Sequence, residues 1–385
     1  MKRNLFTQEH EDFRETIRTF IAKEVTPYYA DWERDNRVPR ELFNKLGDLG
    51  VMGFDIPEEY GGTGTISYKF QAVMDEETSR AAVSFGHYTV STGIVLPYLL
   101  RLANEEQKQR WLPSIATGEK TLCIAMTEPG TGSDLAGIRT TAKLSDDGTH
   151  YVLNGAKTFI TGAVNSELCV VVARTSAPAE DDRRFGLSLM VVPTDAPGFE
   201  YGRKLEKLGL RASDTSELSF TDVKVPVADL LGEQDKGFSY LGQNLPRERL
   251  SIGSRGVASA RAAIEFAKAY VQERQVFGKP VAAFQNTKFV LAECSAEVEA
   301  AQALADRGIE LDDSGELTAA DAARIKLFGT EVAARVIDKC LQLHGGYGYM
   351  LEYPIARLYA DTRVSRIYGG TSEVMKTIIA KDMGL

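Results

Sequence analysis

The stretch C-I-A-M-T-E-P-G-T-G-S-D, residues 123–134, marks the point where the character of the chain changes. It begins with a short apolar run typical of a β-strand and continues into a loop that contains Gly130 and Gly132. Glycine lets a ligand approach backbone amides closely, and Thr127 and Ser133 add hydroxyl groups to the same loop. An ordinary strand-to-loop turn has a similar composition, so this stretch alone indicates either a turn or a ligand-binding loop.

The spacing of the loop differs from two common nucleotide-binding motifs. Position 135 is leucine, where the dinucleotide fingerprint G-x-G-x-x-G requires its third glycine. The loop also lacks the G-K-[ST] ending of a Walker motif. We therefore expect neither a Rossmann site nor a P-loop here.

The residues on either side of this loop predict different secondary structures. Upstream, apolar residues recur at helical spacing, beginning with Phe13, Ile17, Phe20, Ile21 and Val25. From Thr121 to about Leu231, short β-branched runs alternate with breaks rich in Gly, Pro and Asp. Beyond Phe238 three long helical stripes follow, the first through Val257 to Val271, the second through Phe289 to Ala301 and the third through Ile325, Phe328 and Cys340.

This order predicts an α+β multidomain fold. We expect an N-terminal helical domain (1–120), a middle β-barrel or sandwich domain (121–231) and a C-terminal four-helix bundle (232–385). Helices, then strands, then helices argue against alternating βαβ units and a parallel sheet.

Composition narrows the class of protein. The 385 residues are 43% hydrophobic and 26% charged, as in globular proteins. A net charge of −9 without a Lys/Arg tract gives no source for nucleic-acid binding, and no run approaches the roughly 20 apolar residues of a membrane span. Four separated cysteines indicate buried reduced thiols, and no histidine spacing suggests a metal site. We expect a cytoplasmic protein, although a mitochondrial matrix protein without its presequence would look the same.

Five motifs, in this order, make the chain similar to the acyl-CoA dehydrogenase family. They cover nearly the whole chain and are A-M-T-E-P-G-x-G-S-D (125–134), N-G-x-K-x-F-I-T-G (154–162), E-R-x-x-F-G-K-P (273–280), L-H-G-G-Y-G (343–348) and I-Y-x-G-T-S-E (367–373). The resemblance implies the same three-part fold and an FAD cofactor between the β domain and the bundle.

The resemblance also implies which residues hold FAD. Met126, Thr127, Gly132 and Ser133 would face the ring and the pyrophosphate, and Phe159, Ile160 and Thr161 would cover the other side of the ring. Many relatives carry Trp where Phe159 stands. The remaining cofactor positions, of which the first six match the adenosine half across a subunit boundary, are Arg274, Phe277, Gln285, Gln342, Gly345, Gly346, Thr371 and Glu373. A shared site of this kind implies a homotetramer, a dimer of dimers.

The family resemblance leaves one expected residue missing. Many members place a catalytic glutamate where this chain has Gly369. In the isovaleryl and long-chain branches the glutamate lies on a bundle helix instead, at a position that matches Glu248 in L-P-R-E-R-L. Gly369 would keep only its N–H as a donor to the thioester oxygen. Ser133, Arg249 and Gly370 match substrate-binding positions, while a glutamate between two arginines is otherwise usually a solvated charge.

These observations predict an FAD-dependent desaturation of an acyl-CoA thioester. Glu248 would take the α proton, the β hydride would pass to FAD, and an electron-transfer flavoprotein would receive the electrons. Two alternatives stay open: a flavin oxidase, monooxygenase or carrier-protein-linked acyl dehydrogenase on the same scaffold, and a degenerate non-catalytic homologue. The sequence does not specify the length or branching of the acyl chain.

Overall fold

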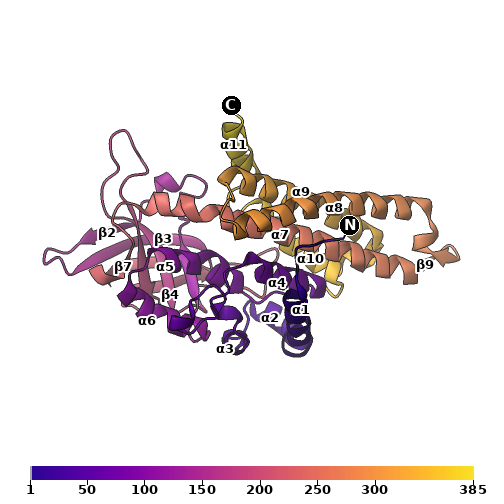
Figure 1. The fold of residues 1–385 in the computed structure, drawn as a ribbon, viewed down its shortest axis with the longest axis horizontal. Coiled ribbons are helices and arrows are strands. Elements are labelled where there is room, and N and C mark those ends of the chain that lie inside the picture. The colour runs from indigo at the N-terminus through magenta and orange to yellow at the C-terminus, as the bar shows by residue number, and fades with distance from the viewer. Residues whose placement is uncertain (1) are drawn as a thin grey trace.

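The computed structural model describes residues 2–385 and has three parts (Figure 1). The N-terminal part is helical, as predicted. Its α-helices are α1 (Gln8–Phe20), α2 (Tyr29–Asp35), α3 (Glu41–Asp48), α4 (Tyr68–Ala81), α5 (Leu96–Leu102) and α6 (Glu105–Ala116). A π-helical segment, η5 (Thr89–Val95), leads into α5. Segments of π-helix are frequent at functional sites, and this one packs against the helix that carries Glu248.

The middle part is a mixed sheet of eight strands within the described residues. The strands are β1 (Leu122–Ala125), β2 (Thr141–Leu144), β3 (His150–Thr161), β4 (Leu168–Arg174), β5 (Leu187–Pro193), β6 (Phe199–Lys204), β7 (Thr215–Pro226) and β8 (Leu230–Leu231). Their order is β6-β7-β3-β2-β4-β5-β8, with β1 pairing in parallel with β4. Most pairs are antiparallel, so the expectation that the chain lacks a βαβ sheet is confirmed.

The C-terminal part is a bundle of long helices. It contains α7 (Gly237–Glu273), α8 (Gln285–Asp313), α9 (Ala319–Leu343), α10 (Pro354–Thr362) and α11 (Ser372–Asp382). A short hairpin, β9 (Gln275–Val276) and β10 (Lys279–Pro280), lies at the end of the bundle distant from the sheet (Figure 1). The predicted order of helices, strands and helices is therefore confirmed.

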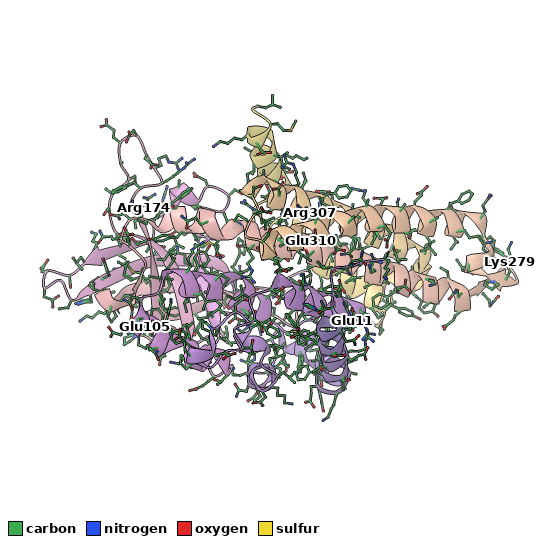
Figure 2. All side chains as sticks on the ribbon, in the orientation of Figure 1. Glu11, Glu105, Arg174, Lys279, Arg307 and Glu310 are labelled. Carbon is green, nitrogen blue, oxygen red and sulfur yellow. The ribbon has the colours of Figure 1, made fainter. Side chains whose placement is uncertain are left out.

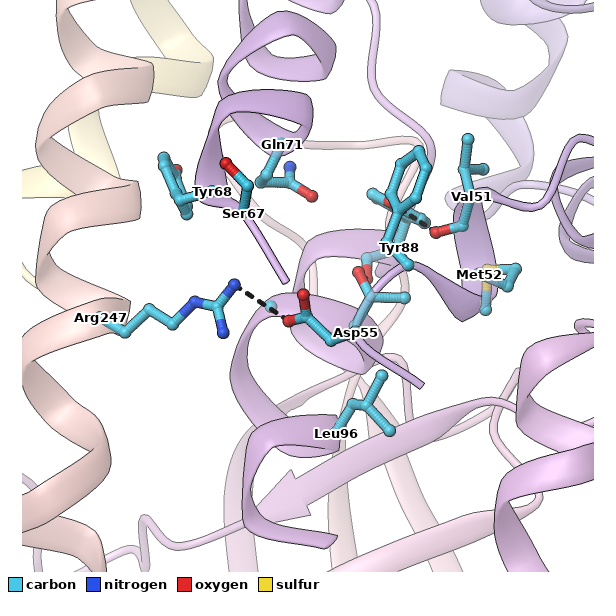
Figure 3. A pocket seen from close by; sticks show the side chains of 12 residues that line it. Val51, Met52, Asp55, Ser67, Tyr68, Gln71, Tyr88, Leu96 and Arg247 are labelled. Atoms are coloured by element: carbon cyan, nitrogen blue, oxygen red, sulfur yellow. Dashed lines mark hydrogen bonds and ion pairs between the residues drawn. The ribbon is translucent and has the colours of Figure 1, made fainter. Parts of the chain in front are cut away.

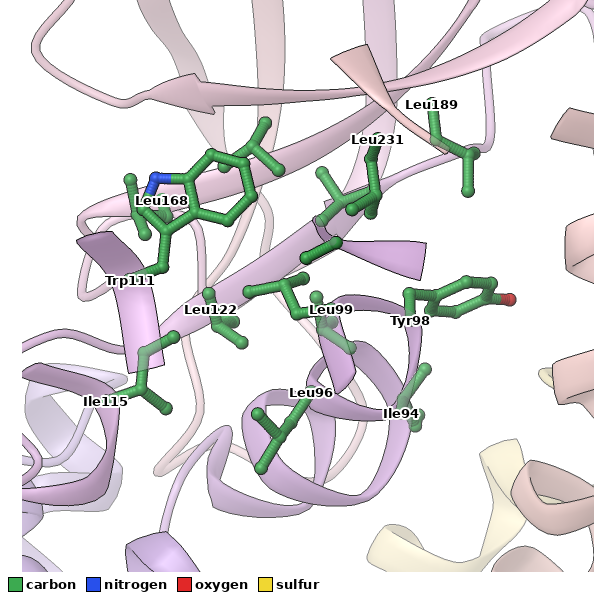
Figure 4. Close-up of a cluster of buried hydrophobic side chains, with 14 of the residues drawn as sticks. Ile94, Leu96, Tyr98, Leu99, Trp111, Ile115, Leu122, Leu168, Leu189 and Leu231 are labelled. Atoms are coloured by element: carbon green, nitrogen blue, oxygen red, sulfur yellow. The ribbon is translucent and has the colours of Figure 1, made fainter. Parts of the chain in front are cut away.

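Two hydrophobic cores involve the sheet. On one face, Leu99, Trp111 and Ile115 of α5 and α6 pack against strand residues such as Leu122 and Leu189 (Figure 4). A second cluster, which includes Val171 and Phe220, is formed mainly by residues of the strands themselves. All four cysteines are buried free thiols, as the sequence predicted.

Glycines set the distance between α7 and α9. A Cβ added at Gly253 would lie 2.7 Å from the carbonyl oxygen of Ile325, and one at Gly329 would lie 2.7 Å from that of Gly253. No real side chain tolerates such contacts with backbone, so both positions require glycine. This close approach brings residue 326 of α9 toward the segment of α7 that begins at Glu248.

The predicted helical stripes need one correction. Phe289 of α8 and Phe328 of α9 are exposed, whereas we expected both in the bundle core. The helical period places them on the edge of each stripe, and the smaller residues Ala301, Val332 and Cys340 fill the interior instead. Elsewhere the bundle surface is charged: Arg307 and Glu310 of α8 form an ion pair of 3.1 Å (Figure 2). No helix within residues 2–385 is both long enough and apolar enough to cross a membrane.

Candidate active site

Glu248 is a buried carboxylate on α7. Its side chain is 6% exposed, and Oε2 has no hydrogen-bond partner among residues 2–385. Burial raises the pKa of Glu248 to about 7, although Arg249 and Lys326 act in the opposite direction. A buried carboxylate with an unpaired oxygen is costly to maintain, and such groups are concentrated at functional sites.

Gly369 faces this carboxylate. A Cβ added at residue 369 would lie 3.5 Å from Glu248 Oε1 and only 2.3 Å from Ile252 Cδ1. The φ of Gly369 is +65°, a conformation that favours glycine over other residues. Space and backbone conformation therefore both require glycine here, because Ile252 Cδ1 fills the position that a side chain at residue 369 would take beside Glu248.

Two cations hold the backbone of this glycine pair. Arg249 Nε donates to the carbonyl oxygen of Gly369 at 3.2 Å, and Lys326 Nζ donates to the carbonyl oxygen of Gly370. Lys326 lies on α9 and is fully buried. Sequence reasoning missed this lysine. The sequence feature that could have revealed it is a charged residue on the same helical face as Ala322, Gly329 and Ala333, which are all buried.

The start of α11 fixes the other side of the glycine pair. Thr371 Oγ1 accepts from the N–H of Val374 at 3.3 Å and so caps the N-terminus of α11. Ser372 Oγ donates to Glu331 Oε1 at 2.7 Å, and Arg366 Nε donates to the same oxygen at 2.9 Å. Glu373 is exposed, and hydrogen bonds from its own N–H and Thr371 lower its pKa.

Two tyrosines also face Glu248. Tyr98 of α5 points away from Leu99 and the rest of its cluster (Figure 4), and its hydroxyl has no partner within residues 2–385. Burial raises the pKa of Tyr98, and the Glu248 carboxylate raises it further. Partial burial also raises the pKa of Tyr368, which is 40% exposed, and Glu248 makes a smaller contribution in the same direction. Both phenols therefore stay neutral beside the carboxylate.

The neighbouring arginine, Arg247, points in a different direction from Glu248. Its Nη2 lies 2.9 Å from Asp55 Oδ2 in a pocket lined by α4, η5 and α7 (Figure 3). Its Nε lies 3.6 Å from Asp312 Oδ2. Successive helical residues are about 100° apart around the axis, so Arg247 is neutralised by these carboxylates on another face of α7.

A buried ion pair supports the loop at residues 126–133. Lys157 Nζ, fully buried on β3, donates to Glu128 Oε1 at 2.9 Å, to the carbonyl of Met126 at 3.1 Å and to that of Val172 at 2.8 Å. Glu128 also accepts from two backbone N–H groups, at residues 139 and 140. Lys157 and these donors lower the pKa of Glu128 despite its burial. Lys157 lies in the motif at residues 154–162, but the sequence did not predict that it supports this loop.

The outer face of this loop is open. A Cβ added at Gly130 or Gly132 would meet nothing within 4 Å, and Ser133 is exposed. Phe159 is 67% exposed at a φ of +60°, an unusual conformation for an aromatic residue. Open glycine amides beside an exposed aromatic side chain fit the flat ring and pyrophosphate of FAD.

The other predicted contacts near the ring differ in accessibility. Met126 and Thr127 are half-buried, and the carbonyl of Thr127 accepts from the N–H of Thr158 at 2.9 Å. Thr161 Oγ1 lies 3.2 Å from Thr215 Oγ1. The side chain of Ile160 belongs to the sheet core, so only its backbone is available to a cofactor.

The residues predicted for the adenosine half lie at the end of the molecule distant from the sheet domain. Lys279, in the hairpin beside Phe277, is at one end of the molecule, and Arg174 of the sheet domain is near the other (Figure 2). Phe277 is 95% exposed, and the Arg274 guanidinium lies 5.6 Å from the centre of the Tyr347 ring. A Cβ at Gly345 or Gly346 would meet nothing within 4 Å. Gln285 begins α8 and Gln342 is close to the end of α9. One chain does not bring the two groups of cofactor residues together.

Comparison with known proteins places the whole chain in one family. The family descriptions that match are "Acyl-CoA dehydrogenase, N-terminal domain" at residues 7–119, "middle domain" at 123–223 and "C-terminal domain" at 235–384. The long-chain specific acyl-CoA dehydrogenase of Sus scrofa mitochondria is 42% identical over 381 residues, covering 99% of this chain and 88% of that protein.

Two solved structures extend this likeness to three dimensions. An acyl-CoA dehydrogenase from Geobacillus kaustophilus is 44% identical with a TM-score of 0.95, and each chain is fully covered. An acyl-CoA dehydrogenase from Bacillus anthracis, complexed with FAD, is 34% identical with a TM-score of 0.90, covering 98% of this chain and 67% of that one. FAD, the predicted cofactor, is thus confirmed as the cofactor of the family. The chain belongs to the acyl-CoA dehydrogenase family of oxidoreductases.

Proposed function

We propose that this protein desaturates an acyl-CoA thioester between its α and β carbons, with Glu248 as the base that removes the α proton. The observation that carries this proposal is the pairing of a buried, partly unsatisfied carboxylate with Gly369, a neighbouring position at which no side chain fits. The usual family position for the base holds no carboxylate in this chain.

The environment of Glu248 suits a base that works near neutral pH. A general base is most effective when its pKa lies close to the operating pH, and burial raises the pKa of Glu248 to about 7. Arg249 and Lys326 keep it from rising further. The buried phenol of Tyr98 stays neutral and adds no second anion beside the carboxylate.

The glycine pair would stabilise the charge that develops on the substrate. The N–H of Gly369 is the proposed donor to the thioester oxygen, and a donor of this type typically contributes about 10²–10³ in rate. Ser133, Arg249 and Gly370 are the proposed substrate contacts. FAD, when bound, supplies the acceptor for the β hydride.

The proposed FAD contacts are those predicted from the sequence. The ring would lie between the loop at residues 126–133 and Phe159, with Thr371 and Glu373 at the start of α11 close to it. The adenosine half would extend to Arg274, Phe277 and Gln285 of another subunit. The distance between these two groups in one chain and the 95% exposure of Phe277 support this sharing and a homotetramer.

We also propose an electron-transfer flavoprotein as the acceptor. A chain described as an electron-transferring flavoprotein of Acidaminococcus fermentans superposes on this one with a TM-score of 0.92 at 30% identity. The cytoplasmic location stays a prediction, as do the domain boundaries at 120 and 231.

A panel of acyl-CoA thioesters tests the proposed reaction. The purified holoprotein is mixed anaerobically with straight and branched acyl-CoAs of increasing length, and the flavin absorbance is followed. We expect at least one thioester to bleach the flavin and yield the enoyl product. Bleaching by none of them would contradict the proposal. Rapid reoxidation by oxygen with peroxide formation would instead favour an oxidase.

A further inference from the structure

We propose that Lys326 is a positioning residue that holds the Gly369–Gly370 peptide units in place opposite Glu248. Its effect on the reaction rests on the function proposed above. Its effect on the conformation of the glycine pair does not.

The geometry of the two glycines requires external support. Their φ angles are +65° and +94°, and glycine alone has little preference for these values over others. Gly369 and Gly370 each have a carbonyl oxygen bonded to a buried cation, from Arg249 on α7 and Lys326 on α9 respectively. Two successive peptide units are therefore fixed from two different helices.

Fixing a carbonyl also fixes the N–H on the other side of the same peptide bond. In a trans peptide these two groups point in opposite directions, so holding the Gly370 carbonyl orients the N–H of Thr371. Holding the Gly369 carbonyl orients the N–H of Gly370 in the same way. The N–H of Gly369 belongs to the preceding peptide unit, so the two cations act on it only through the position of the two units that follow. Lys326 thus orients the N–H of Thr371 directly and, together with Arg249, holds the backbone that follows the N–H of Gly369.

The charge of Lys326 has a second effect at the same place. The groups that face it are Arg249 and Glu248 of α7, Glu331 of its own helix and Glu373 of α11. Burial and Arg249 lower the pKa of Lys326 to about 8, and the three carboxylates act against this. The ammonium is therefore still the main form at neutral pH, and it favours the charged form of Glu248.

Structural support alone does not explain a lysine at this position. Lys326 is 0% exposed, and the hydrogen bond that it donates within residues 2–385 goes to a backbone carbonyl. The nearest carboxylate on its own helix, Glu331, is bonded to Arg366 and Ser372 instead. Burying an ammonium without a directly bonded carboxylate is expensive, and an apolar residue of similar length would pack there without that cost.

The test compares Lys326→Met, which removes both charge and donor, with Lys326→Gln, which keeps a neutral donor. Lys268→Met is the matched control, because Lys268 is an exposed residue of α7 whose neighbour Glu265 lies 3.7 Å away. It is also roughly 30 Å from Glu248 along the helix. Amide hydrogen exchange of the segment 366–372 is measured by mass spectrometry, and the rate of anaerobic flavin reduction is measured against pH.

We expect the amide hydrogens of this segment to exchange about tenfold faster in Lys326→Met than in the unmodified holoprotein. In both Lys326 variants the acidic limb of the pH profile should move upward by about one pH unit. Lys268→Met should change neither quantity. If Lys326→Met does not fold, Lys326→Gln still tests the shift of the pH profile.

Unchanged exchange together with an unchanged pH profile would overturn the proposal. Faster exchange with an unmoved pH profile would overturn the proposed effect of Lys326 on the reaction, because Lys326 would then be only a structural contact of the loop. Glu248→Gln is measured in parallel. Full activity of that variant would contradict the proposed base, whereas the exchange result would still decide whether Lys326 holds the loop.

Discussion

Glu248 and Gly369 face each other so closely that a side chain at residue 369 would begin 3.5 Å from Glu248 Oε1. The carboxylate comes from a bundle helix and the glycine from the loop before α11. The two residues are therefore direct neighbours in space, and Ile252 leaves no room for a side chain at residue 369 beside the carboxylate.

Gly369→Ala should disturb the site even though it adds a single methyl group. The new Cβ would meet Ile252 Cδ1 at 2.3 Å, and alanine is strained at a φ of +65°. We expect a loss of about 1–3 kcal/mol in unfolding free energy and slower flavin reduction. Thermal unfolding with and without FAD measures the first effect.

Gly242→Ala is the control for this variant. Gly242 lies on the same helix as Glu248, and a Cβ there would meet nothing within 4 Å. Alanine should leave stability unchanged or raise it by up to about 1 kcal/mol. Equal stability of both variants would mean that residue 369 is not sterically restricted.

The rate of flavin reduction should rise with pH through about 7. Glu248 acts as a base only when deprotonated, and its pKa is raised to about 7. Stopped-flow reduction under anaerobic conditions, from pH 5.5 to 8.5, measures this limb. A rate that is constant over the range would exclude a base with this pKa.

Folding stability should also report on Glu248. The folded-state pKa of about 7 lies above the ordinary glutamate pKa of 4.5, so the folded protein binds the extra proton between these two pH values. Stability contributed by Glu248 is therefore lost as pH rises from 4.5 toward 7. Glu248→Gln should remove this loss and gain up to about 3 kcal/mol at pH 8. Denaturant unfolding of both proteins at pH 5 and pH 8 measures the difference, and equal pH dependence would contradict the burial of a charge here.

Lys157→Met should weaken both folding and FAD retention. The substitution leaves Glu128 buried without its cation and removes hydrogen bonds to the carbonyls of Met126 and Val172. Breaking a buried pair in this way typically costs about 3–5 kcal/mol. Unfolding curves and the FAD content after purification measure the two effects. Lys143→Met, at an exposed residue of β2, should be neutral in both, and equal behaviour of the two variants would disprove the role of Lys157.

The assembly can be tested through Phe277. Light scattering of the holoprotein should give four times the 42.3 kDa chain mass, because the adenosine site needs a second subunit. Phe277→Ser should lower FAD retention with little change in chain stability, since its ring is almost fully exposed in one chain. A monomer that keeps stoichiometric FAD would contradict the shared site.

Some of these features were predictable from the sequence because they are local. Helical periods, β-branched runs and the cap at Thr371 depend on neighbouring residues, and the structure has each of them. Lys326 and Lys157 were not recognised, because their burial results from contacts with distant segments. The carbonyl that Lys326 binds is 44 residues away in the chain. The exposure of Phe289 and Phe328 was missed for a different reason, because helical periodicity predicts which face is apolar but not how far the buried part of that face extends.

The most direct test is the rate at which the best acyl-CoA of the panel reduces the flavin of the Glu248→Gln variant. Glutamine has nearly the shape of glutamate but does not accept a proton at neutral pH. We expect full FAD content, intact thioester binding and a reduction rate lower by about 10²–10⁴. A variant that binds FAD and reduces it at the rate of the unmodified protein would show that the α proton goes elsewhere.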